Sequence, residues 1–369
     1  MFEHLVALES ALDAVLPRPR LRGRLPVELV ATARQWSEAV WKEAERLGPF
    51  PISAAEIVHG LQVAMRPVFV CGVHRSGTTL VRDLIDGHPR LAVLPSEGSF
   101  YTNHRRHLSF AGLAEWRHFM ACEWCRRLVN PLNQPPYWLL GRSTPASSPP
   151  VAFMRALAAW WPVVSEHLAA ASAWPLAAVA LAFAGHAQEG PIDAAVHGWV
   201  EKTPTNEQFL LDLWRDFPAA KVVHIVRDPV AVVASRKTME EYATGSFTAL
   251  RRTLADLARS YRIADGERVL RDPQRRYLLI RFEDLLADPE RAIGCLAEFL
   301  GVENLPILHR PTSRGLSTTG NSSFGTGEAG TIDRTRGRAD VDLLSADEQL
   351  RLAVTVGDAA AAVRYAVPA

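Results

Sequence analysis

The sequence predicts an α/β fold in which a parallel β-sheet is flanked by helices. Three short apolar runs support this prediction: Val68–Cys71, Lys221–Val226 and Tyr277–Phe282. Each run has the length and the β-branched or aromatic content of a buried strand. Helical patterns follow these runs along the chain, and strands that alternate with helices are typical of parallel sheets covered on both faces.

A glycine-bounded loop follows the first of these strands. It comprises Gly72 to Thr79 (GVHRSGTT) and leads into a helix with apolar residues at Leu80, Leu84 and Ile85. A strand, such a loop and a helix start direct backbone N–H groups at an anion. The spacing fits the nucleotide P-loop, but Thr78 stands in the place of the lysine that grips the transferred phosphate, and Arg75 supplies the cation instead. The loop therefore predicts a P-loop-like α/β fold that binds phosphate but does not carry out ATP chemistry.

Length and charge set the limits of the prediction. The 369 residues carry 41 Lys and Arg against 40 Asp and Glu, so the balance does not favour a nucleic-acid partner. The longest apolar run, Trp174–Ala184, is too short to span a bilayer, and the N-terminus lacks the pattern of a secretory signal. We therefore expect a cytoplasmic protein without an integral membrane segment. The Ala- and Arg-rich composition suggests a bacterial source with a high-GC genome.

Residues 1–66 are predicted to form a helical N-terminal extension to a domain spanning 67–369. Apolar residues recur at helical spacing, and Ser53-Ala54-Ala55-Glu56 has the pattern of a capping box. The extension contains no motif of known chemistry. Its role is either to pack on the sheet or to meet a partner chain, as in a homodimer.

A carboxylate follows the next predicted strand, Leu91–Leu94. Glu97 lies in the loop after this strand, and loops at the carboxyl ends of parallel strands form the ligand crevice of such sheets. A carboxylate at this position can act as general base toward a hydroxyl or an amine. Position alone equally allows a surface glutamate or a salt bridge to a nearby arginine.

The stretch from about 105 to 190 is predicted to be a helical insertion or lid over the crevice. It is rich in proline and contains six of the ten tryptophans: Trp116, Trp124, Trp138, Trp160, Trp161 and Trp174. These side chains could line a partly apolar pocket for an acceptor substrate, but ordinary core packing explains them as well. Contact with a membrane surface is a third reading, although the stretch lacks a Lys- and Arg-rich polar face.

Two further cationic motifs follow predicted strands. Lys202-Thr203-Pro204 comes after a short apolar run, and Thr205-Asn206-Glu207-Gln208 has the pattern of a second capping box. The Lys221–Val226 strand ends in Arg227-Asp228-Pro229, and Ser235 follows eight residues after Arg227. An arginine at a strand end and a hydroxyl on the next helix suit a second phosphate.

These motifs resemble those of sulfotransferases that use 3′-phosphoadenosine 5′-phosphosulfate (PAPS). Arg75-Ser76-Gly77-Thr78-Thr79-Leu80 is similar to the family's 5′-phosphosulfate loop, and Arg227 with Ser235 is similar to its 3′-phosphate motif. The resemblance implies that Arg75, Ser76, Gly77, Thr78 and Thr79 cradle the 5′-phosphosulfate, while Arg227 and Ser235 hold the 3′-phosphate. The second phosphate separates PAPS from ATP, which has none at the 3′ position.

The resemblance also implies catalytic roles. It is nearer to the branch that contains the protein-tyrosine sulfotransferases than to the cytosolic branch, because Glu97 follows His88-Pro89 where that branch has its catalytic base. Cytosolic members use a histidine, so His104 and His107 are alternative bases. Lys202, together with Arg75, is expected to stabilise charge on the transferring group and the leaving oxygen.

The C-terminal part of the chain carries weaker signals. Phe282 stands where the family often has a nucleotide-contacting tyrosine, so no polar contact is expected from it. Composition predicts a mobile loop over 310–338, and Arg336 or Arg338 of the 334–338 run is a candidate contact for the 3′-phosphate. Helix caps are predicted at Asp288 and Ser345.

Cys122 and Cys125 form a C-x-x-C pair that either supplies half of a zinc site or places two neighbours on one helix face. No spacing completes a zinc site, so we expect no metal. The predicted function is sulfuryl transfer from PAPS to a hydroxyl or amine acceptor, with Glu97 as base. The alternatives are a P-loop kinase or NTPase, and a non-catalytic nucleotide-binding protein.

Overall fold

The structure is a computed structural model of the whole chain. It describes residues 27–94, 97–105, 150–185, 190–237, 247–270, 274–318, 328–337 and 341–367. The chain forms two compact units. Unit 1 contains residues 1–67, 89–199 and 215–218, and unit 2 contains residues 68–88, 200–214 and 219–369.

The predicted α/β class is confirmed by a five-stranded parallel sheet in the order β2-β3-β1-β4-β5. Its strands are β1 (Pro67–Cys71), β2 (Leu91–Val93), β3 (Gly198–Lys202), β4 (Lys221–Val226) and β5 (Tyr277–Arg281). In unit 2, β4 pairs in parallel with β1 on one side, with Val70 opposite Val223, and with β5 on the other. Every residue of β1 is buried, as a strand covered on both faces requires.

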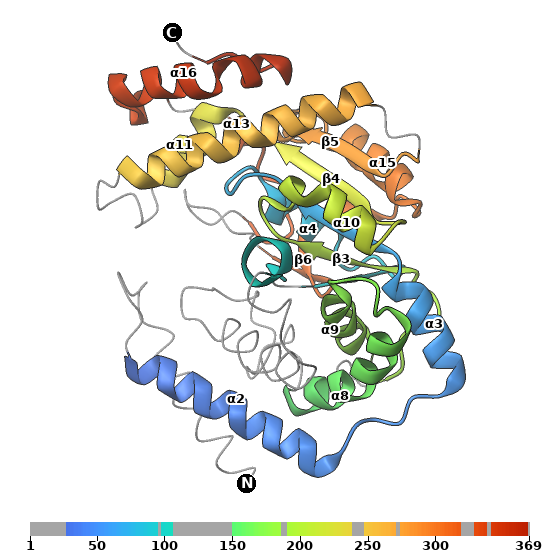
Figure 1. The fold of residues 1–369 in the computed structure, drawn as a ribbon. Helices are drawn as coiled ribbons and strands as arrows, with labels where there is room; N and C mark the ends of the chain where they lie inside the picture. The colour runs from blue at the N-terminus through green and yellow to red at the C-terminus, as the bar shows by residue number, and fades with distance from the viewer. Residues whose placement is uncertain are drawn as a thin grey trace. The chain divides into compact units, whose positions relative to one another are not determined.

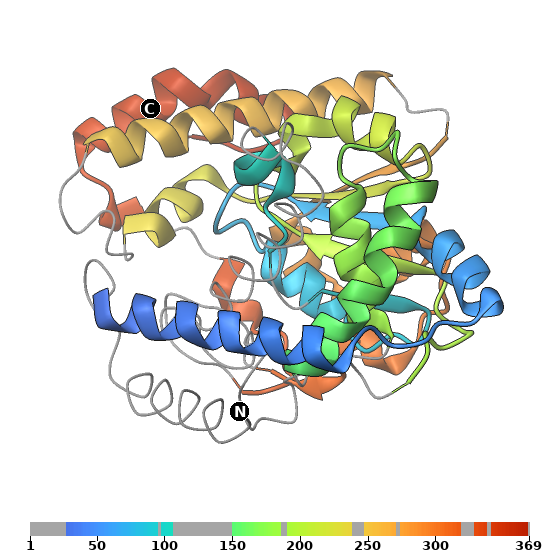
Figure 2. The same ribbon diagram turned by 60° about the horizontal axis from the view of Figure 1, so that its bottom comes forward.

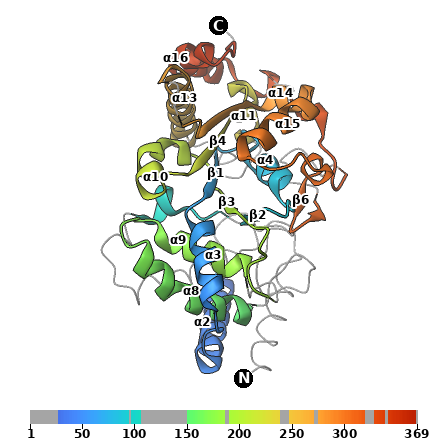
Figure 3. The ribbon, with the colours of Figure 1, turned by 90° about the vertical axis from the view of Figure 1, so that its right-hand side faces the viewer.

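Helices cover both faces of the sheet in unit 2. Figure 3 shows α13 on one side of β1 and β4, and α4 with α15 on the other. The helices and turns of this unit are α4 (Thr78–Ile85), η4 (Asn206–Phe209), α11 (Pro229–Lys237), α13 (Phe247–Leu270), α14 (Phe282–Ala287), α15 (Pro289–Leu300), η5 (Pro306–His309), η6 (Arg334–Gly337), η7 (Val341–Leu343) and α16 (Ala346–Ala362), and α10 (Leu210–Asp216) is divided between the two units.

The caps predicted for two of these helices are confirmed. The Asp288 side chain accepts a hydrogen bond from the N–H of Arg291 at the start of α15. Ser345 and Glu348 form a reciprocal capping box at the start of α16. Such local signals determine helix starts because the side chain and the N–H group it satisfies are only three residues apart.

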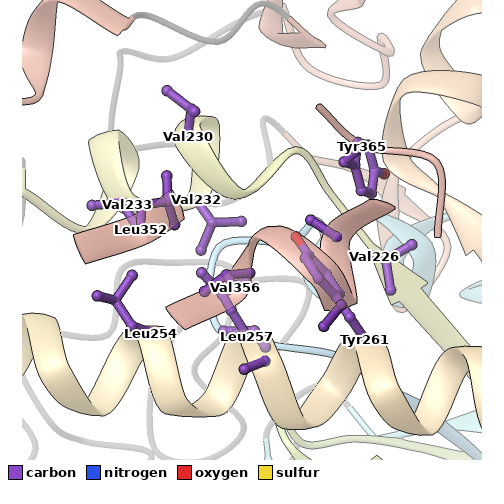
Figure 4. Close-up of a cluster of buried hydrophobic side chains, with 14 of the residues drawn as sticks. Val226, Val230, Val232, Val233, Leu254, Leu257, Tyr261, Leu352, Val356 and Tyr365 are labelled. Atoms are coloured by element: carbon purple, nitrogen blue, oxygen red, sulfur yellow. The ribbon is translucent and has the colours of Figure 1, made fainter. Parts of the chain in front are cut away.

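The long helices α13 and α16 lie side by side in unit 2 (Figure 2). Together with α11 they enclose a hydrophobic core, shown in Figure 4, in which Val232, Leu257 and Val356 are fully buried. Tyr261 and Tyr365 extend this core toward the end of β4, where Val226 lies.

Unit 1 is built mainly of helices (Figure 1). They are α2 (Val27–Leu47), α3 (Ala54–Ala64), a π-helical turn η1 (Phe100–His104), α8 (Pro150–His167) and α9 (Trp174–Ala184). The predicted capping box of Ser53 and Glu56 is confirmed. In the described part of the chain, none of the helices is both long and apolar enough to cross a membrane.

Core packing accounts for two of the tryptophans of the predicted insertion. Trp160 and Trp161 are at most 1% exposed, and α9 is buried from Pro175 to Phe183. A Cβ at Gly60 of α3 would lie 2.3 Å from the Trp160 ring, so glycine allows α3 to approach α8 closely. The described parts of 1–66 and 105–190 thus belong to one compact unit, and the predicted domain boundaries stay a prediction. Trp116, Trp124 and Trp138 lie outside the described residues.

The predicted mobile loop at 310–338 is wrong for residues 312–317, which form a β-hairpin of β6 (Thr312–Ser313) and β7 (Leu316–Ser317). Asp86 after α4 holds this hairpin, because its carboxylate accepts hydrogen bonds from the Thr312 hydroxyl (2.9 Å) and the Gly315 N–H (2.8 Å). A partner 226 residues away in the chain therefore orders a segment that composition alone predicts to be mobile.

Candidate functional site

The glycine-bounded loop adopts the conformation that its sequence predicts. Gly72 has a φ of 137°, and a Cβ there would lie 2.1 Å from the carbonyl oxygen of Ile225. Gly77 has a φ of 98°, and its Cβ would lie 2.4 Å from the Phe282 ring. Only glycine fits both positions. The loop leads into α4 at Thr78, so the N–H groups of the first helical turn are available to an anion bound in the loop.

Three residues of the loop carry polar side chains: Arg75, Ser76 and Thr78. Arg75 has a φ of 76°, an unusual left-handed conformation for a residue other than glycine. Ser76 is 1% exposed, and its hydroxyl has no hydrogen-bond partner among the residues that the structure describes. Thr78, which replaces the P-loop lysine, is 4% exposed. A buried hydroxyl without a partner is costly, so a bound anion would be a natural acceptor for Ser76.

The two predicted phosphate motifs meet in unit 2. The Arg75 guanidinium donates to the Ser235 hydroxyl through Nε at 2.9 Å. Arg227 donates through Nη1 to the Arg75 carbonyl oxygen at 3.0 Å, and its guanidinium lies 4.5 Å from the centroid of the Phe282 ring. Arg75, Arg227 and Ser235 therefore form one cluster, although 152 residues separate the two arginines.

Lys202 is the last residue of β3 and is 5% exposed. The backbone after it is joined to β1 and to the glycine-bounded loop at 72–79, which we call the phosphate loop. The Thr203 N–H donates to the Val70 carbonyl (3.2 Å), and the Thr205 N–H donates to the Gly72 carbonyl (2.9 Å). Lys202 thus lies at the same edge of the sheet as Arg227. This edge is formed by the carboxyl ends of the parallel strands, where ligands bind in such folds.

The second predicted capping box is wrong. Thr205 has a φ of 67°, its side chain makes no capping hydrogen bond, and a short 3-10 turn precedes α10. Glu207, which the capping pattern left without a role, instead points to the phosphate loop, where its Oε2 accepts from the Gly72 N–H at 3.0 Å. Glu201 stabilises the same segment by accepting hydrogen bonds from Thr203 and from Asn206.

Sequence reasoning missed a buried polar chain behind the loop. His224 in the middle of β4 contacts the Ser260 hydroxyl at 2.8 Å and the Tyr277 hydroxyl at 2.6 Å. Burial raises the pKa of Glu207 to about 7, against the opposing effect of hydrogen bonds from Ser260 and Gly72. Burial lowers the pKa of His224 to about 3, so this imidazole is neutral. The sequence signal for this buried polar network is a histidine inside a strand of β-branched residues.

The turn at Arg227-Asp228-Pro229, which we call the Arg227 turn, is also fixed by side chains of neighbouring helices. The Asp228 carboxylate caps α11 by accepting from the Ala231 N–H at 3.0 Å. The Asp228 N–H donates to Glu283 Oε1 at 2.9 Å, and the Tyr261 hydroxyl donates to the Arg227 carbonyl oxygen. Side chains from α13 and α14 thereby fix the backbone at Arg227 and Asp228.

Glu97, the predicted base, belongs to unit 1 and is half-buried after β2. The segment that follows it is anchored by Tyr101, whose hydroxyl donates to the buried Asp216 at 2.8 Å, and Ser99 has a φ of 51°. His104 ends the π-helical turn η1, and His107 lies outside the described residues. Glu97 and the two alternative bases stay predictions.

Arg336 and Arg338, the candidate contacts for the 3′-phosphate, stay predictions. Arg336 lies in the helical turn η6 (Arg334–Gly337), and Arg338 lies outside the described residues. Cys122 and Cys125 also lie outside them, and within the described ranges no group of three or more His, Cys, Asp or Glu residues could hold a metal.

The cluster has the chemistry of a site for an anionic ligand. Arg75 and Arg227 provide charge, Ser76 and Ser235 provide hydroxyls, and α4 provides N–H groups. Guanidinium groups suit phosphate because two parallel N–H groups can bind two of its oxygens.

Comparisons with known proteins identify the family. A sequence model described as "Sulfotransferase family" matches residues 67–306. No curated protein matches the chain significantly. Among solved structures, the sulfotransferase domain from the Synechococcus PCC 7002 olefin synthase is 21% identical with a TM-score of 0.43, covering 82% of this chain and 96% of that one. The sulfotransferase STF1 from Mycobacterium tuberculosis H37Rv is 17% identical with a TM-score of 0.41, covering 83% and 84%. Since the family match spans well over half of the sequence and includes all three cationic motifs, the chain belongs to the Sulfotransferase family and is an enzyme of sulfuryl transfer.

Proposed function

We propose that the sulfuryl donor is PAPS and that the acceptor is a hydroxyl or amine. The observation that carries this proposal is the cluster of Arg75, Ser235 and Arg227, which brings the phosphate loop and the Arg-Asp-Pro turn together. A donor with a 5′-phosphosulfate and a 3′-phosphate needs both motifs within the length of one nucleotide. ATP has no group for the second motif.

The residues fit the two ends of this donor. Arg75, Ser76, Gly77, Thr78 and Thr79 would hold the 5′-phosphosulfate at the start of α4, and the unpartnered Ser76 hydroxyl supports this assignment. Arg227 and Ser235 would hold the 3′-phosphate. Arg75 already contacts Ser235, so donor binding would exchange or share this hydrogen bond.

In the proposed reaction, the acceptor oxygen or nitrogen forms a bond to sulfur. The bond between sulfur and the bridging oxygen of the phosphosulfate breaks, and adenosine bisphosphate leaves. Glu97 takes the proton of the acceptor, while Lys202 and Arg75 offset the negative charge that grows on the leaving oxygen. Such in-line transfers depend mainly on positioning and charge stabilisation. The proposal needs no metal because two arginines and a lysine supply positive charge at the site.

Calorimetric titration with 3′,5′-adenosine bisphosphate tests the donor, with 5′-AMP and ATP–Mg²⁺ as comparison ligands. We expect tight binding of the bisphosphate, weak binding of 5′-AMP, and a loss of about 10- to 100-fold in bisphosphate affinity for Arg227→Ala, because an arginine–phosphate pair is a strong charge-assisted contact. Arg251→Ala, at an exposed position of α13, is the matched control and should bind like the wild type.

Preference for ATP–Mg²⁺, or equal binding by Arg227→Ala and the wild type, would overturn the PAPS assignment.

Transfer of radiolabelled sulfate from PAPS to a panel of phenols, sugars and amines then tests the base. Glu97→Gln should bind the bisphosphate normally and lose about 10²- to 10⁴-fold in transfer rate, which is the usual contribution of a general base.

A further inference from the structure

A tyrosine outside the family-matched region reaches the Arg227 turn. Glu283 uses its two carboxylate oxygens for different partners: Oε1 accepts from the Asp228 N–H at 2.9 Å, and Oε2 accepts from the Tyr365 hydroxyl at 2.6 Å. Tyr365 follows α16, whereas the family match ends at residue 306. The side chain that supports the turn is therefore itself held by the C-terminal segment.

Tyr365 is firmly placed. It is 5% exposed, its N–H donates to the Ala360 carbonyl oxygen at 2.9 Å, and its ring lies 5.9 Å from that of Tyr261. Figure 4 shows both tyrosines at the end of the core formed by α11, α13 and α16. The Arg281 guanidinium covers the Tyr365 ring at 4.5 Å. Burial raises the pKa of Tyr365, so its hydroxyl stays protonated and keeps donating to Glu283.

Both sides of the Arg227–Asp228 peptide are fixed by these two tyrosines. Tyr261 donates directly to the Arg227 carbonyl oxygen. Tyr365 acts one step further away, because Glu283 lies between its hydroxyl and the Asp228 N–H. The direction of this peptide determines where the Arg227 side chain leaves the backbone, and Arg227 then contacts Arg75 and Phe282.

We propose that Tyr365 is a positioning residue for the 3′-phosphate site and that it acts through Glu283. This inference rests on the proposed function, since it assigns Arg227 to the 3′-phosphate. Without the Tyr365 hydroxyl, one oxygen of Glu283 loses its donor, and the carboxylate can turn away from Asp228. The Arg227 turn then samples other conformations, and the bound arrangement is populated for a smaller fraction of the time. Contacts to the 5′-phosphate come from the Arg75 loop, so they are affected less.

The test compares Tyr365→Phe with the wild type in calorimetric titrations of 3′,5′-adenosine bisphosphate and 5′-AMP. The phenylalanine keeps the ring against Tyr261 and Arg281 and removes only the hydroxyl. We expect the affinity for the bisphosphate to fall about 5- to 20-fold, as for loss of one hydrogen bond to a charged group, and the affinity for 5′-AMP to fall less, by about twofold at most. Arg351→Ala, on the exposed side of α16, is the control for general changes in that helix.

A second variant tests the route through Glu283. Glu283→Ala removes both carboxylate oxygens, so the Tyr365 hydroxyl has no side chain through which it can act on the Asp228 N–H. If Tyr365 acts through Glu283, the double variant should bind the bisphosphate no more weakly than the worse single variant. Additive losses would overturn the proposed route.

The outcomes separate the inference from the proposed function. If the wild type prefers the bisphosphate and Tyr365→Phe keeps the full preference, the role of Tyr365 is refuted and the donor assignment stands. Equal losses for both ligands, accompanied by a lower melting temperature, would mean that Tyr365 serves stability alone. If the wild type does not distinguish the two ligands, the donor assignment itself fails, and the role of Tyr365 falls with it.

Discussion

The buried carboxyl group of Glu207, behind the phosphate loop, should make stability fall as the pH rises. Most acidic groups have the opposite effect. Burial raises the pKa of Glu207 from its ordinary value of 4.5 to about 7 in the folded protein. Between these two values the unfolded chain releases the proton while the native protein keeps it. Raising the pH from 4.5 to 7 therefore favours unfolding, and the lost stability amounts to about 3 kcal/mol at 1.36 kcal/mol per pH unit.

His224 acts in the opposite direction in the same window. Burial lowers its pKa from 6.5 to about 3, so the unfolded chain gains a proton below pH 6.5 that the native protein does not accept. Its contribution is complete above pH 6.5 and is lost as the pH falls toward 3, by up to about 5 kcal/mol. From pH 4.5 to 6.5 the slopes of the two groups cancel, so the stability of the wild type should show neither effect there.

Glu207→Gln separates the two contributions, because glutamine does not titrate and its carbonyl can still accept from the Gly72 N–H. We expect the free energy of unfolding of this variant, relative to the wild type, to rise by about 3 kcal/mol between pH 4.5 and 8. The measurement is urea denaturation followed by circular dichroism at half-unit intervals of pH. Taking the difference between the two proteins removes every group that titrates alike in both.

Glu348→Gln is the matched control. Burial would raise the pKa of Glu348, but the hydrogen bonds from Lys237 and Ser345 outweigh burial and lower it. Its contribution is present above pH 4.5 and lost below, so its difference curve should be flat from pH 5 to 8. A flat curve for Glu207→Gln, or one that falls with pH, would show that Glu207 is already ionised in the acidic native protein and would refute the reasoning.

Three other variants test local packing. Gly77→Ala would force a Cβ to 2.4 Å from the Phe282 ring at a φ of 98°; bisphosphate affinity measured by calorimetry should fall more than tenfold, and unchanged affinity would disprove the tight fit of the loop. Thr312→Val removes the buried hydroxyl that donates to Asp86, so urea denaturation should show that the free energy of unfolding falls by about 1–3 kcal/mol. Thr312→Ser keeps a hydroxyl and should keep most of the wild-type stability. Gly60→Ala would place a methyl group 2.3 Å from the Trp160 ring and should lower stability by about 1–3 kcal/mol in the same assay, while Gly190→Ala, which has open space around its Cβ, should not.

The parts of the site that were predictable depend on residues close together in sequence. The strand, loop and helix at 68–85 follow from a few adjacent residues, because φ angles and helix starts are determined locally. The convergence of Arg75 and Arg227 also follows, since carboxyl ends of parallel strands share one edge of the sheet. The cap of α16 at Ser345 needed only a glutamate three residues on.

The failures have a common physical cause, which is competition from a distant partner. Thr205 has the pattern of a cap, but its left-handed backbone and the bond from its N–H to Gly72 favour another geometry. Glu207 binds a backbone group 135 residues away, and Asp86 orders a hairpin that composition predicts to be mobile. No window of sequence contains both members of such pairs, so local patterns could not reveal them.

The order of the strands has a consequence for how the enzyme acquires activity. β1 and β4 are neighbours in the sheet, yet Val70 pairs with Val223, so the chain must close a long loop before Arg75 can meet Ser235. Contacts between residues so far apart in sequence form late, because the entropy of loop closure must be overcome first. In a refolding experiment, recovery of transferase activity should therefore lag behind recovery of helix content. During synthesis on the ribosome, the phosphate loop must wait for more than 150 further residues before it has its partners.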